Sequence, residues 1–356
     1  MKIEFRNRII LTVLCFFVAH LAWAYNMRQT TNRDGLSNSA VLSMAQDDSG
    51  YLWIGTCDGV NIADGRSVRS FGQIFPGQTL SGNIIESICN GGNGRMWVLT
   101  NYGLDLVNTK TGQVTTFKQF GGQEQLAFGA DGFMYLLGED SGLYRISADK
   151  DKDNGFEKLG RVAIPFRDVR RMAVRGDKLW ILANGGIRMI SIPGQGNENA
   201  AIGVKTVDNE PILFAKVFGN EIFVVTHDAL ICRVLDNGKR LPLADISEEV
   251  RRRGRISDIA RNHKGQFFVS FSTDGVIQVD ASDVSNPVIS DMDLKVGVFC
   301  LGASSKQDVV WIGSDCQGLY TCWDDSYGIR SFDFNALGNK TTHPIRSIYI
   351  DDQKNL

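Results

Sequence analysis

Histidine, cysteine and proline are scarce in this sequence: its 356 residues include 4 His, 7 Cys and 7 Pro. Three histidines lie beyond the N-terminal segment (His227, His263 and His343), in no HExxH motif and at no metal-ligand spacing. The cysteines form no CxxC pair, which argues against a zinc site. No GxSxG motif occurs, and the GQG at 194–196 lacks the third glycine of a dinucleotide site. We therefore expect no catalytic residues, no metal and no cofactor.

An excess of charge of either sign is also missing. The chain has 38 Lys and Arg against 40 Asp and Glu, for a net charge of −2, and this near-neutrality gives no reason to expect nucleic acid or an anionic membrane as a partner. Long apolar runs are absent after residue 24. Residues 1–24 place three basic residues before an apolar run and end in Ala22-Trp23-Ala24, which is typical of a cleaved secretory signal peptide. We expect an exported, soluble chain.

Six cysteines follow that segment: Cys57, Cys89, Cys232, Cys300, Cys316 and Cys322. An oxidising compartment permits disulfides, and Cys316 and Cys322 could face each other across one hairpin. Because most of the six stand inside strand-like runs, we expect mostly buried thiols.

Glycine is abundant, with 38 residues, and residues 35–65 contain a unit that recurs along the chain. Its sequence is GLSNSAVLSMAQDDSGYLWIGTCDGVNIADG, which predicts three short strands separated by polar turns. The position of Trp53 recurs at intervals of 38–45 residues, as Trp97, Tyr135, Trp180, Phe223, Phe268 and Trp311. A repeat of this length built from strands is typical of a propeller blade.

The fold class predicted from this period is all-β. We expect a seven-bladed β-propeller of four-stranded antiparallel blades over residues 25–338. The fourth strand of a blade is the least regular; we expect it at 67–71, 113–117, 155–159, 204–207 and, in the last blade, 330–334.

Along the second strand of a unit, one face carries branched apolar residues, such as Leu52 and Ile54, and the other face carries a large ring and a glycine. Trp53 with Gly55, and Trp311 with Gly313, combine a large ring with a missing side chain on one strand face. We interpret Trp53, Gly55, Trp97, Trp180, Trp311 and Gly313 as packing residues between blades.

The two ends of the repeat region carry further information. Residues 25–30 are strand-like and have no unit of their own, so they could pair with the last blade and close the ring. Residues 345–356 repeat the pattern of 41–52 and stop one residue before the tryptophan position. We expect 339–356 to begin a further propeller repeat, as in the front fragment of a longer protein.

The pattern GLS, then D-x-x-G-x-L-W-I-G-T, then DGV in residues 35–60 resembles the two-component regulator propeller repeat. Similar patterns cover nearly all of 25–356. The resemblance implies the periplasmic sensor region of a hybrid two-component system histidine kinase of Bacteroidetes. It implies a longer protein with a second propeller, a β-sandwich, a membrane helix, a kinase, a receiver and a DNA-binding domain, dimeric through the domains outside this chain. Members of the family typically bind glycan breakdown products and control polysaccharide-utilisation genes.

A ligand is expected where blades expose loops. The turn between the second and third strands and the connection to the next blade emerge on one face, here called the loop face. The residues predicted to bind an oligosaccharide there are Asn101, Tyr102, Asp140, Phe166, Arg167, His227, Arg252, Arg253, Asp274 and Gln317. The basic run 251–255 could bind a uronate or sulfate through bidentate contacts, or it could be a solvated loop or a salt-bridged contact with the second propeller.

Two functions follow from these observations. The first is a non-catalytic, periplasmic, ligand-sensing propeller; this chain itself would not be an enzyme. The alternative is a stand-alone exported propeller that acts as a glycan-active enzyme or as an extracellular interaction scaffold.

Overall fold

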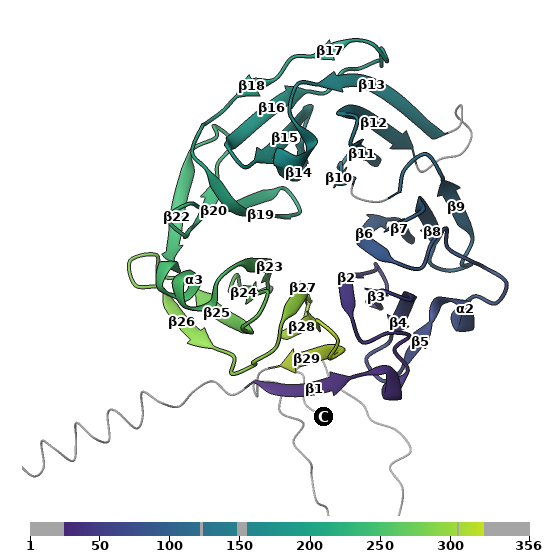
Figure 1. Cartoon of the computed structure of the whole chain (residues 1–356), viewed down its shortest axis with the longest axis vertical. Coiled ribbons are helices and arrows are strands. Elements are labelled where there is room, and N and C mark those ends of the chain that lie inside the picture. Colours follow the sequence, from purple (N-terminus) through teal and green to yellow (C-terminus); the bar gives the residue numbers. More distant parts are fainter. Residues whose placement is uncertain (1–24, 122–123, 148–154, 305, 324–356) are drawn as a thin grey trace, which may run out of the picture. The chain divides into compact units, whose positions relative to one another are not determined.

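The computed structural model describes residues 25–121, 124–147, 155–304 and 306–323, and within these ranges the strands form seven sheets around a common centre (Figure 1). Each sheet is a blade with four antiparallel strands; blade 3 adds a fifth strand in parallel, and the outer strand of blade 7 comes from the start of the chain. The prediction of an all-β, seven-bladed propeller is thereby confirmed. The expected signal peptide (1–24) and the expected start of a further repeat (339–356) lie outside the described residues.

Blades 1 to 4 are formed by consecutive segments, with the innermost strand first. Blade 1 consists of β2 (Val41–Gln46), β3 (Leu52–Thr56), β4 (Gly59–Ala63) and β5 (Val68–Ser70). Blade 2 consists of β6 (Ile85–Gly92), β7 (Arg95–Thr100), β8 (Gly103–Asn108) and β9 (Val114–Phe117). Blade 3 consists of β10 (Gln125–Phe128), β11 (Phe133–Leu137), β12 (Gly142–Ser147) and β13 (Phe156–Val162). Blade 4 consists of β14 (Val169–Arg175), β15 (Lys178–Ala183), β16 (Gly186–Ser191) and β18 (Lys205–Thr206).

Blades 5 and 6 keep this order, and blade 7 completes the ring. Blade 5 consists of β19 (Ile212–Phe218), β20 (Glu221–Thr226), β21 (Leu230–Val234) and β22 (Arg240–Asp245). Blade 6 consists of β23 (Ile256–Arg261), β24 (Phe267–Phe271), β25 (Val276–Asp280) and β26 (Val288–Asp291). Blade 7 consists of β27 (Val298–Ala303), β28 (Val309–Ser314), β29 (Leu319–Trp323) and β1 (Asn26–Thr30).

Short elements connect or extend the blades. They are the helices α2 (Phe71–Ile74) and α3 (Ser247–Arg253), the 3-10 turns η1 (Asn32–Asp34) and η3 (Phe166–Asp168), and β17 (Ala201–Ile202). The sequence pattern did not predict β17, which pairs in parallel with β13. None of the helices in the described ranges has the length and apolar character needed to span a membrane.

The first and last strands of the propeller lie in the same blade. β1 pairs antiparallel with β29, from Asn26 opposite Trp323 to Thr30 opposite Leu319, as expected for residues 25–30. This pairing covers the outer edge of β29, which would otherwise present unpaired backbone groups. The prediction of a fourth strand at 330–334 is wrong at this position, because β1 occupies it; residues 330–334 themselves lie outside the described ranges.

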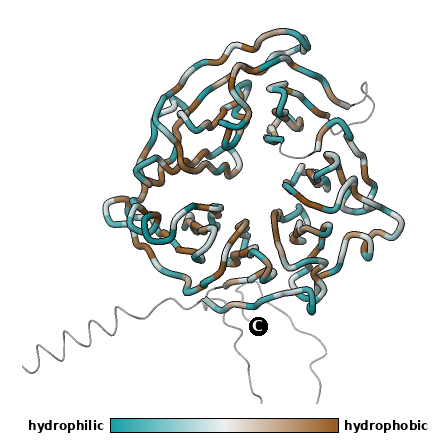
Figure 2. Tube along the Cα trace, in the orientation of Figure 1, coloured by the Kyte–Doolittle hydropathy of each residue, from teal (hydrophilic) through white to brown (hydrophobic). Residues whose placement is uncertain are grey.

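Buried hydrophobic residues gather between neighbouring blades. Each of the seven interfaces in the described ring holds one cluster, and hydrophobic segments occur in every blade (Figure 2). Trp53 of blade 1, for example, is 1% exposed and belongs to one cluster with Ile85 and Ile88 of blade 2. The core is therefore a ring of interfaces and not a single centre.

Glycines on the second strands make this approach possible. A Cβ atom at Gly55 would lie 2.5 Å from Cγ2 of Ile85 in the next blade. A Cβ atom at Gly313 would lie 2.7 Å from Cγ1 of Val41 across the interface between blades 7 and 1. Since real Cβ atoms essentially never approach so closely, a side chain at either position would force its neighbours to shift.

The turn before the second strand of blade 1 holds its tryptophan in place. Asp47 Oδ2 accepts a hydrogen bond from Nε1 of Trp53 at 3.0 Å, while Oδ1 accepts from the backbone N–H groups of Ser49 and Tyr51. Blade 3 uses the same arrangement, with Asp131 Oδ2 accepting from the hydroxyl of Tyr135 at 2.6 Å. These carboxylates satisfy the polar atom of a buried ring, which would be costly if left unpaired.

Candidate functional site

A cavity of about 900 Å³ occupies the centre of the ring. The innermost strands of all seven blades contribute to its wall, namely β2, β6, β10, β14, β19, β23 and β27. A cavity of this size is in the range of small-molecule sites, which are concave and carry a few placed polar groups. We refer to it as the channel.

Six of the seven innermost strands contain an irregularity of register near their first residues. The extra residue is Leu42, Glu86, Arg170, Leu213, Ser257 or Phe299 in blades 1, 2, 4, 5, 6 and 7. A bulge sets two residues opposite one and so changes the direction of a side chain. Four of these residues, Leu42, Glu86, Ser257 and Phe299, line the channel.

The residue that follows each bulge can link its blade to the next. Ser43 Oγ of blade 1 accepts a hydrogen bond from the N–H of Ile88 in blade 2 at 2.9 Å. Asp258 Oδ2 of blade 6 accepts from the N–H of Leu301 in blade 7 at 2.9 Å. Side chains of the channel wall therefore also hold the ring together.

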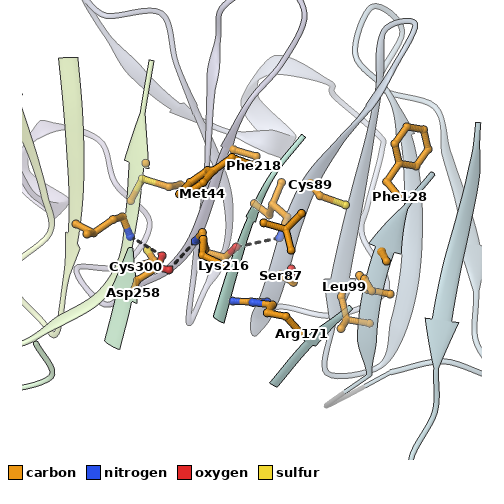
Figure 3. A pocket seen from close by; sticks show the side chains of 18 of the residues that line it. Met44, Ser87, Cys89, Leu99, Phe128, Arg171, Lys216, Phe218, Asp258 and Cys300 are labelled. Carbon is orange, nitrogen blue, oxygen red and sulfur yellow. Dashed lines mark hydrogen bonds and ion pairs between the residues drawn. The ribbon is translucent and has the colours of Figure 1, made fainter. Parts of the chain in front are cut away.

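Asp258 has a cationic partner from the preceding blade. Lys216 Nζ of blade 5 donates to Asp258 Oδ1 at 2.5 Å, and the N–H of Ile259 donates to the same oxygen at 2.8 Å. The side chains of Lys216 and Asp258 are 20% and 8% exposed. Figure 3 shows this pair in the wall, with dashed lines that run from Lys216 to Asp258 and from Asp258 to blade 7. The charges of this pair are matched within the chain.

Other charges of the channel wall are not matched in this way. Burial raises the pKa of Glu86, and the carboxylate of Glu124 nearby raises it further. Glu124 Oε1 accepts from the N–H of Gly121 at 2.8 Å, but its Oε2 is buried without a hydrogen-bond partner in the described part of the chain. Arg167 and Arg171 line the blade 4 side of the channel.

The loop face is built as the sequence predicts. Backbone hydrogen bonds join second-to-third strand turns to the connections between blades, for example from Asn101 to Ile84, Asn184 to Asp168 and Ser272 to Arg255. Since the bulges lie just after these connections, they surround the end of the channel that opens on the loop face. We call this end the channel mouth.

Two of the ten predicted binding residues, Phe166 and Arg167, line the channel. The others lie elsewhere on the loop face. Asn101 accepts a bond from the N–H of Ile84, Tyr102 is 70% exposed, and His227 is exposed outside the channel wall.

Three further predicted residues are engaged in bonds within the chain. Asp140 accepts from Gly142 N–H at 2.8 Å and from Lys158 Nζ at 3.1 Å. Gln317 accepts through its backbone oxygen from Gln29 and through its side chain from Tyr320, and the backbone oxygen of Asp274 accepts from Arg253.

The basic run 251–255 begins in α3 and not in a loop. The side chain of Arg253 is 3% exposed, donates to Glu249 at 2.8 Å and to Asp291, and packs over the ring of Phe271. Arg252 donates to Glu249 at 2.7 Å. Both arginines therefore have ion-pair partners inside this propeller, an arrangement that none of the interpretations from the sequence included.

Sequence reasoning missed most of the channel wall, including Glu86, Glu124, Arg171 and Phe299. One signal was available. Charged residues interrupt otherwise apolar innermost strands, as Lys216 does in ILFAKVF, and a charge inside such a strand indicates a wall that meets water or a partner.

The six cysteines of the described ranges are free thiols. Cys232, Cys300 and Cys322 are buried, Cys89 is partly buried, and burial raises the pKa of Cys322 to about 12. Half of the six thiols are thus fully buried, while Cys57 and Cys316 are exposed. The suggested pairing of Cys316 with Cys322 is wrong, because Cys322 faces Val310 and Met27 across its neighbouring strands while Cys316 is exposed in the turn.

No three His, Cys, Asp or Glu side chains in the described ranges are grouped so that they could hold a metal ion.

Comparison with known families and structures relates residues 35–58 to one family, the two component regulator propeller. These residues span the start of the repeat unit through the turn after β3. The resemblance inferred from the GLS and WIGT patterns is thereby confirmed. Comparison with curated proteins finds no match.

Solved structures similar to this chain include extracellular domains of two component systems. The extracellular domain of BT3049 from B. thetaiotaomicron, described as a hybrid two component system, has a TM-score of 0.60 at 16% identity. That similarity covers 84% of this chain and 42% of the other. The extracellular domain of BT4673 from the same organism, also described as a hybrid two component system, has a TM-score of 0.60 at 15% identity, with coverages of 84% and 39%. This chain thus spans about two fifths of those domains.

An enzyme of the same fold is also similar. Virginiamycin B lyase from Staphylococcus aureus has a TM-score of 0.60 at 12% identity, covering 84% of this chain and 98% of its own. At these identities the comparisons establish a shared propeller fold.

Proposed function

We propose that this chain is the ligand-sensing propeller of a hybrid two-component system, because its repeat unit matches the two component regulator propeller and its fold is shared with extracellular domains of such systems. The ligand would be an oligosaccharide bound at the channel mouth. The chain would be exported to the periplasm after removal of residues 1–24.

One observation supports the position of the site. The channel is a cavity of about 900 Å³ whose mouth carries an exposed aromatic ring and charged groups that have no ion pair among the described residues. Phe299, at the bulge of β27, is 41% exposed although it is a large hydrophobic residue. Saccharides are bound by planar rings together with placed polar groups, and exposed aromatic side chains in a concave site are a common form of such surfaces.

The output would require further domains of a longer protein. A second propeller and a β-sandwich would follow this domain, and a membrane helix and histidine kinase would carry the signal to polysaccharide-utilisation genes. A ligand shifts a receptor only by binding two of its states with different affinity. A closed ring of seven packed blades is a poor two-state element, so we place the switch in the packing between domains and expect the receptor to dimerise through its other domains.

Titration calorimetry with a panel of plant and host oligosaccharides tests this proposal. Replacement of Phe299 with alanine should weaken binding by about tenfold, the effect of roughly 1.4 kcal/mol of lost contact. Val288, which is 58% exposed on the outer strand β26, offers a matched control: Val288→Ala should leave affinity unchanged. Binding that survives Phe299→Ala would place the site elsewhere, and a chain that binds no saccharide would contradict the proposal.

A stand-alone exported propeller, either an enzyme or a scaffold, is the second candidate. It is favoured by the similarity to virginiamycin B lyase, which covers nearly the whole of that enzyme. The two candidates differ in turnover. A glycan-active enzyme would change the bound oligosaccharide during incubation, whereas a sensor would return it unaltered, and mass spectrometry of the recovered saccharide distinguishes them.

A further inference from the structure

Two arginines on the blade 4 side of the channel have no bonded partner among the described residues. Arg167, in η3, and Arg171, directly after the bulge of β14, line the channel and make no hydrogen bond or ion pair with any residue in the described ranges. Figure 3 shows Arg171 among the side chains drawn in the cavity, with no dashed line from it. Both are exposed to the solvent of the channel.

The remaining cations around the channel behave differently. Lys216 is paired with Asp258, and Arg261 donates to Glu221 and lies over the rings of Phe223 and Phe267. The unpaired state of Arg167 and Arg171 is thus a feature of one wall and not of the channel as a whole.

The opposite charge lies on the neighbouring wall. Glu86 of blade 2 and Glu124, directly before blade 3, line the channel and are close enough for each carboxylate to repel the other. No ion pair joins either of them to Arg167 or Arg171 within the described ranges, although blades 3 and 4 are adjacent in the ring. The mouth therefore presents an acidic wall and a basic wall side by side, with Phe299 contributed by blade 7.

We propose that the channel mouth selects an oligosaccharide with a single acidic group, a carboxylate or sulfate, which binds Arg167 and Arg171 while its neutral hydroxyl groups face Glu86 and Glu124. This inference rests on the proposed saccharide-binding function and adds the chemical class of the ligand.

The chemistry of the two walls supports this choice. A guanidinium has a planar set of donors that matches a carboxylate or sulfate in a bidentate manner. A carboxylate only accepts, so Glu86 and Glu124 would receive hydrogen bonds from saccharide hydroxyl groups. A polyanionic saccharide would bring like charges against the acidic wall, and such contacts select against the wrong ligand.

Matched pairs of saccharides test the inference on the purified full chain. One arm uses xylotriose bearing one glucuronate and galactobiose bearing one glucuronate; the second arm uses the same compounds with the carboxyl group reduced to an alcohol. A third arm uses tetragalacturonate as a polyanion. We expect at least one acidic compound to bind about tenfold or more tightly than its reduced twin and than tetragalacturonate, and this preference to weaken at high salt.

Variants locate the effect. Arg167→Gln and Arg171→Gln should each reduce the preference for the acidic compound over its twin by about tenfold, with the affinity for the twin unchanged. Glu86→Gln should raise the affinity for tetragalacturonate. Arg66→Gln, at an exposed turn of blade 1 outside the channel wall, is the matched charge control and should change none of these affinities. Unaltered thermal unfolding checks that each variant is folded.

The outcomes separate this inference from the function on which it rests. If acidic and reduced twins bind equally, or if both arginine variants keep the preference, the single-acid inference is overturned while saccharide binding stands. If none of the saccharides binds in any arm, the proposed function fails and the inference fails with it.

Discussion

The contribution of the ion pair between Lys216 and Asp258 to the free energy of unfolding can be measured by substitution. Replacing Lys216 with methionine keeps most of the volume of the side chain and removes its charge. Asp258 would keep its two backbone donors, the N–H groups of Ile259 and Leu301, but would lose the cation 2.5 Å from its Oδ1. Its side chain, at 8% exposure, would then be a nearly buried charge without a countercharge.

Removing one partner of a buried ion pair costs about 3–5 kcal/mol. Because Lys216 is 20% exposed to the channel and two N–H donors remain on Asp258, we expect the lower end, about 3 kcal/mol. The double variant Lys216→Met with Asp258→Asn removes both charges and leaves an amide that still accepts from Leu301. We expect it to be about 1–2 kcal/mol more stable than Lys216→Met alone, since the isolated charge is gone.

Urea unfolding followed by tryptophan fluorescence measures these differences, with the midpoint compared at constant slope. Lys158→Met is a control, because its ion pair joins the outer strand β13 to Asp140 in the turn between β11 and β12, outside the channel wall, and involves a carboxylate that is 44% exposed. It should cost less than about 1 kcal/mol. The reasoning would be refuted if Lys216→Met cost no more than this control, or if the double variant were no more stable than Lys216→Met alone.

Three further predictions concern the ring. Gly55→Ala should destabilise the chain by about 1–3 kcal/mol in urea unfolding, since its Cβ would overlap Ile85, whereas Gly72→Ala, which meets open space, should have little effect. Deletion of β1 should expose the edge of β29 and promote association, seen by light scattering; a monomeric product of unchanged stability would contradict the role of β1 in closure. The N–H of Gly94 lowers the pKa of Asp48, so this stabilisation is present above the pKa of the unfolded carboxyl and is lost as pH falls through the folded value; Asp48→Asn should therefore lose less stability than the wild type between pH 5 and pH 2.

The blades themselves could be predicted from the sequence because their information is local. Each unit contains its own strands, turns and tryptophan position within about 45 residues. The alternation around Trp53 and Gly55 indicates a packing face without any knowledge of the partner. Closure of the ring by residues 25–30 was also predictable. This strand belongs to no repeat unit of its own, and the last blade of a closed propeller needs an outer strand to cover its free edge. The exception was the outer strand of blade 7. Residues 25–30 and 330–334 both have a strand-like sequence, and the local pattern alone could not show which of the two segments takes this position.

The channel was decided by the tertiary structure. Its wall takes one strand from each of seven blades, so Glu86, Glu124, Arg171 and Phe299 become neighbours of one cavity although they are far apart along the chain. Local patterning predicts that a residue lies on an innermost strand, but a bulge shifts the direction of its side chain, and six such shifts surround the mouth.

Loop position alone was likewise a weak guide to the site. Arg253 has the residue type and the face expected of a ligand contact, yet Glu249 and Asp291 occupy its donors. Arg171 lies within β14 and not in a loop, and its guanidinium has no carboxylate partner in the described ranges. The sequence alone determined the repeating blade and its packing residues, because these depend on contacts set by a short period. Only the closed ring decided which charges are paired and which remain free, because pairing depends on distances between blades that no local pattern contains.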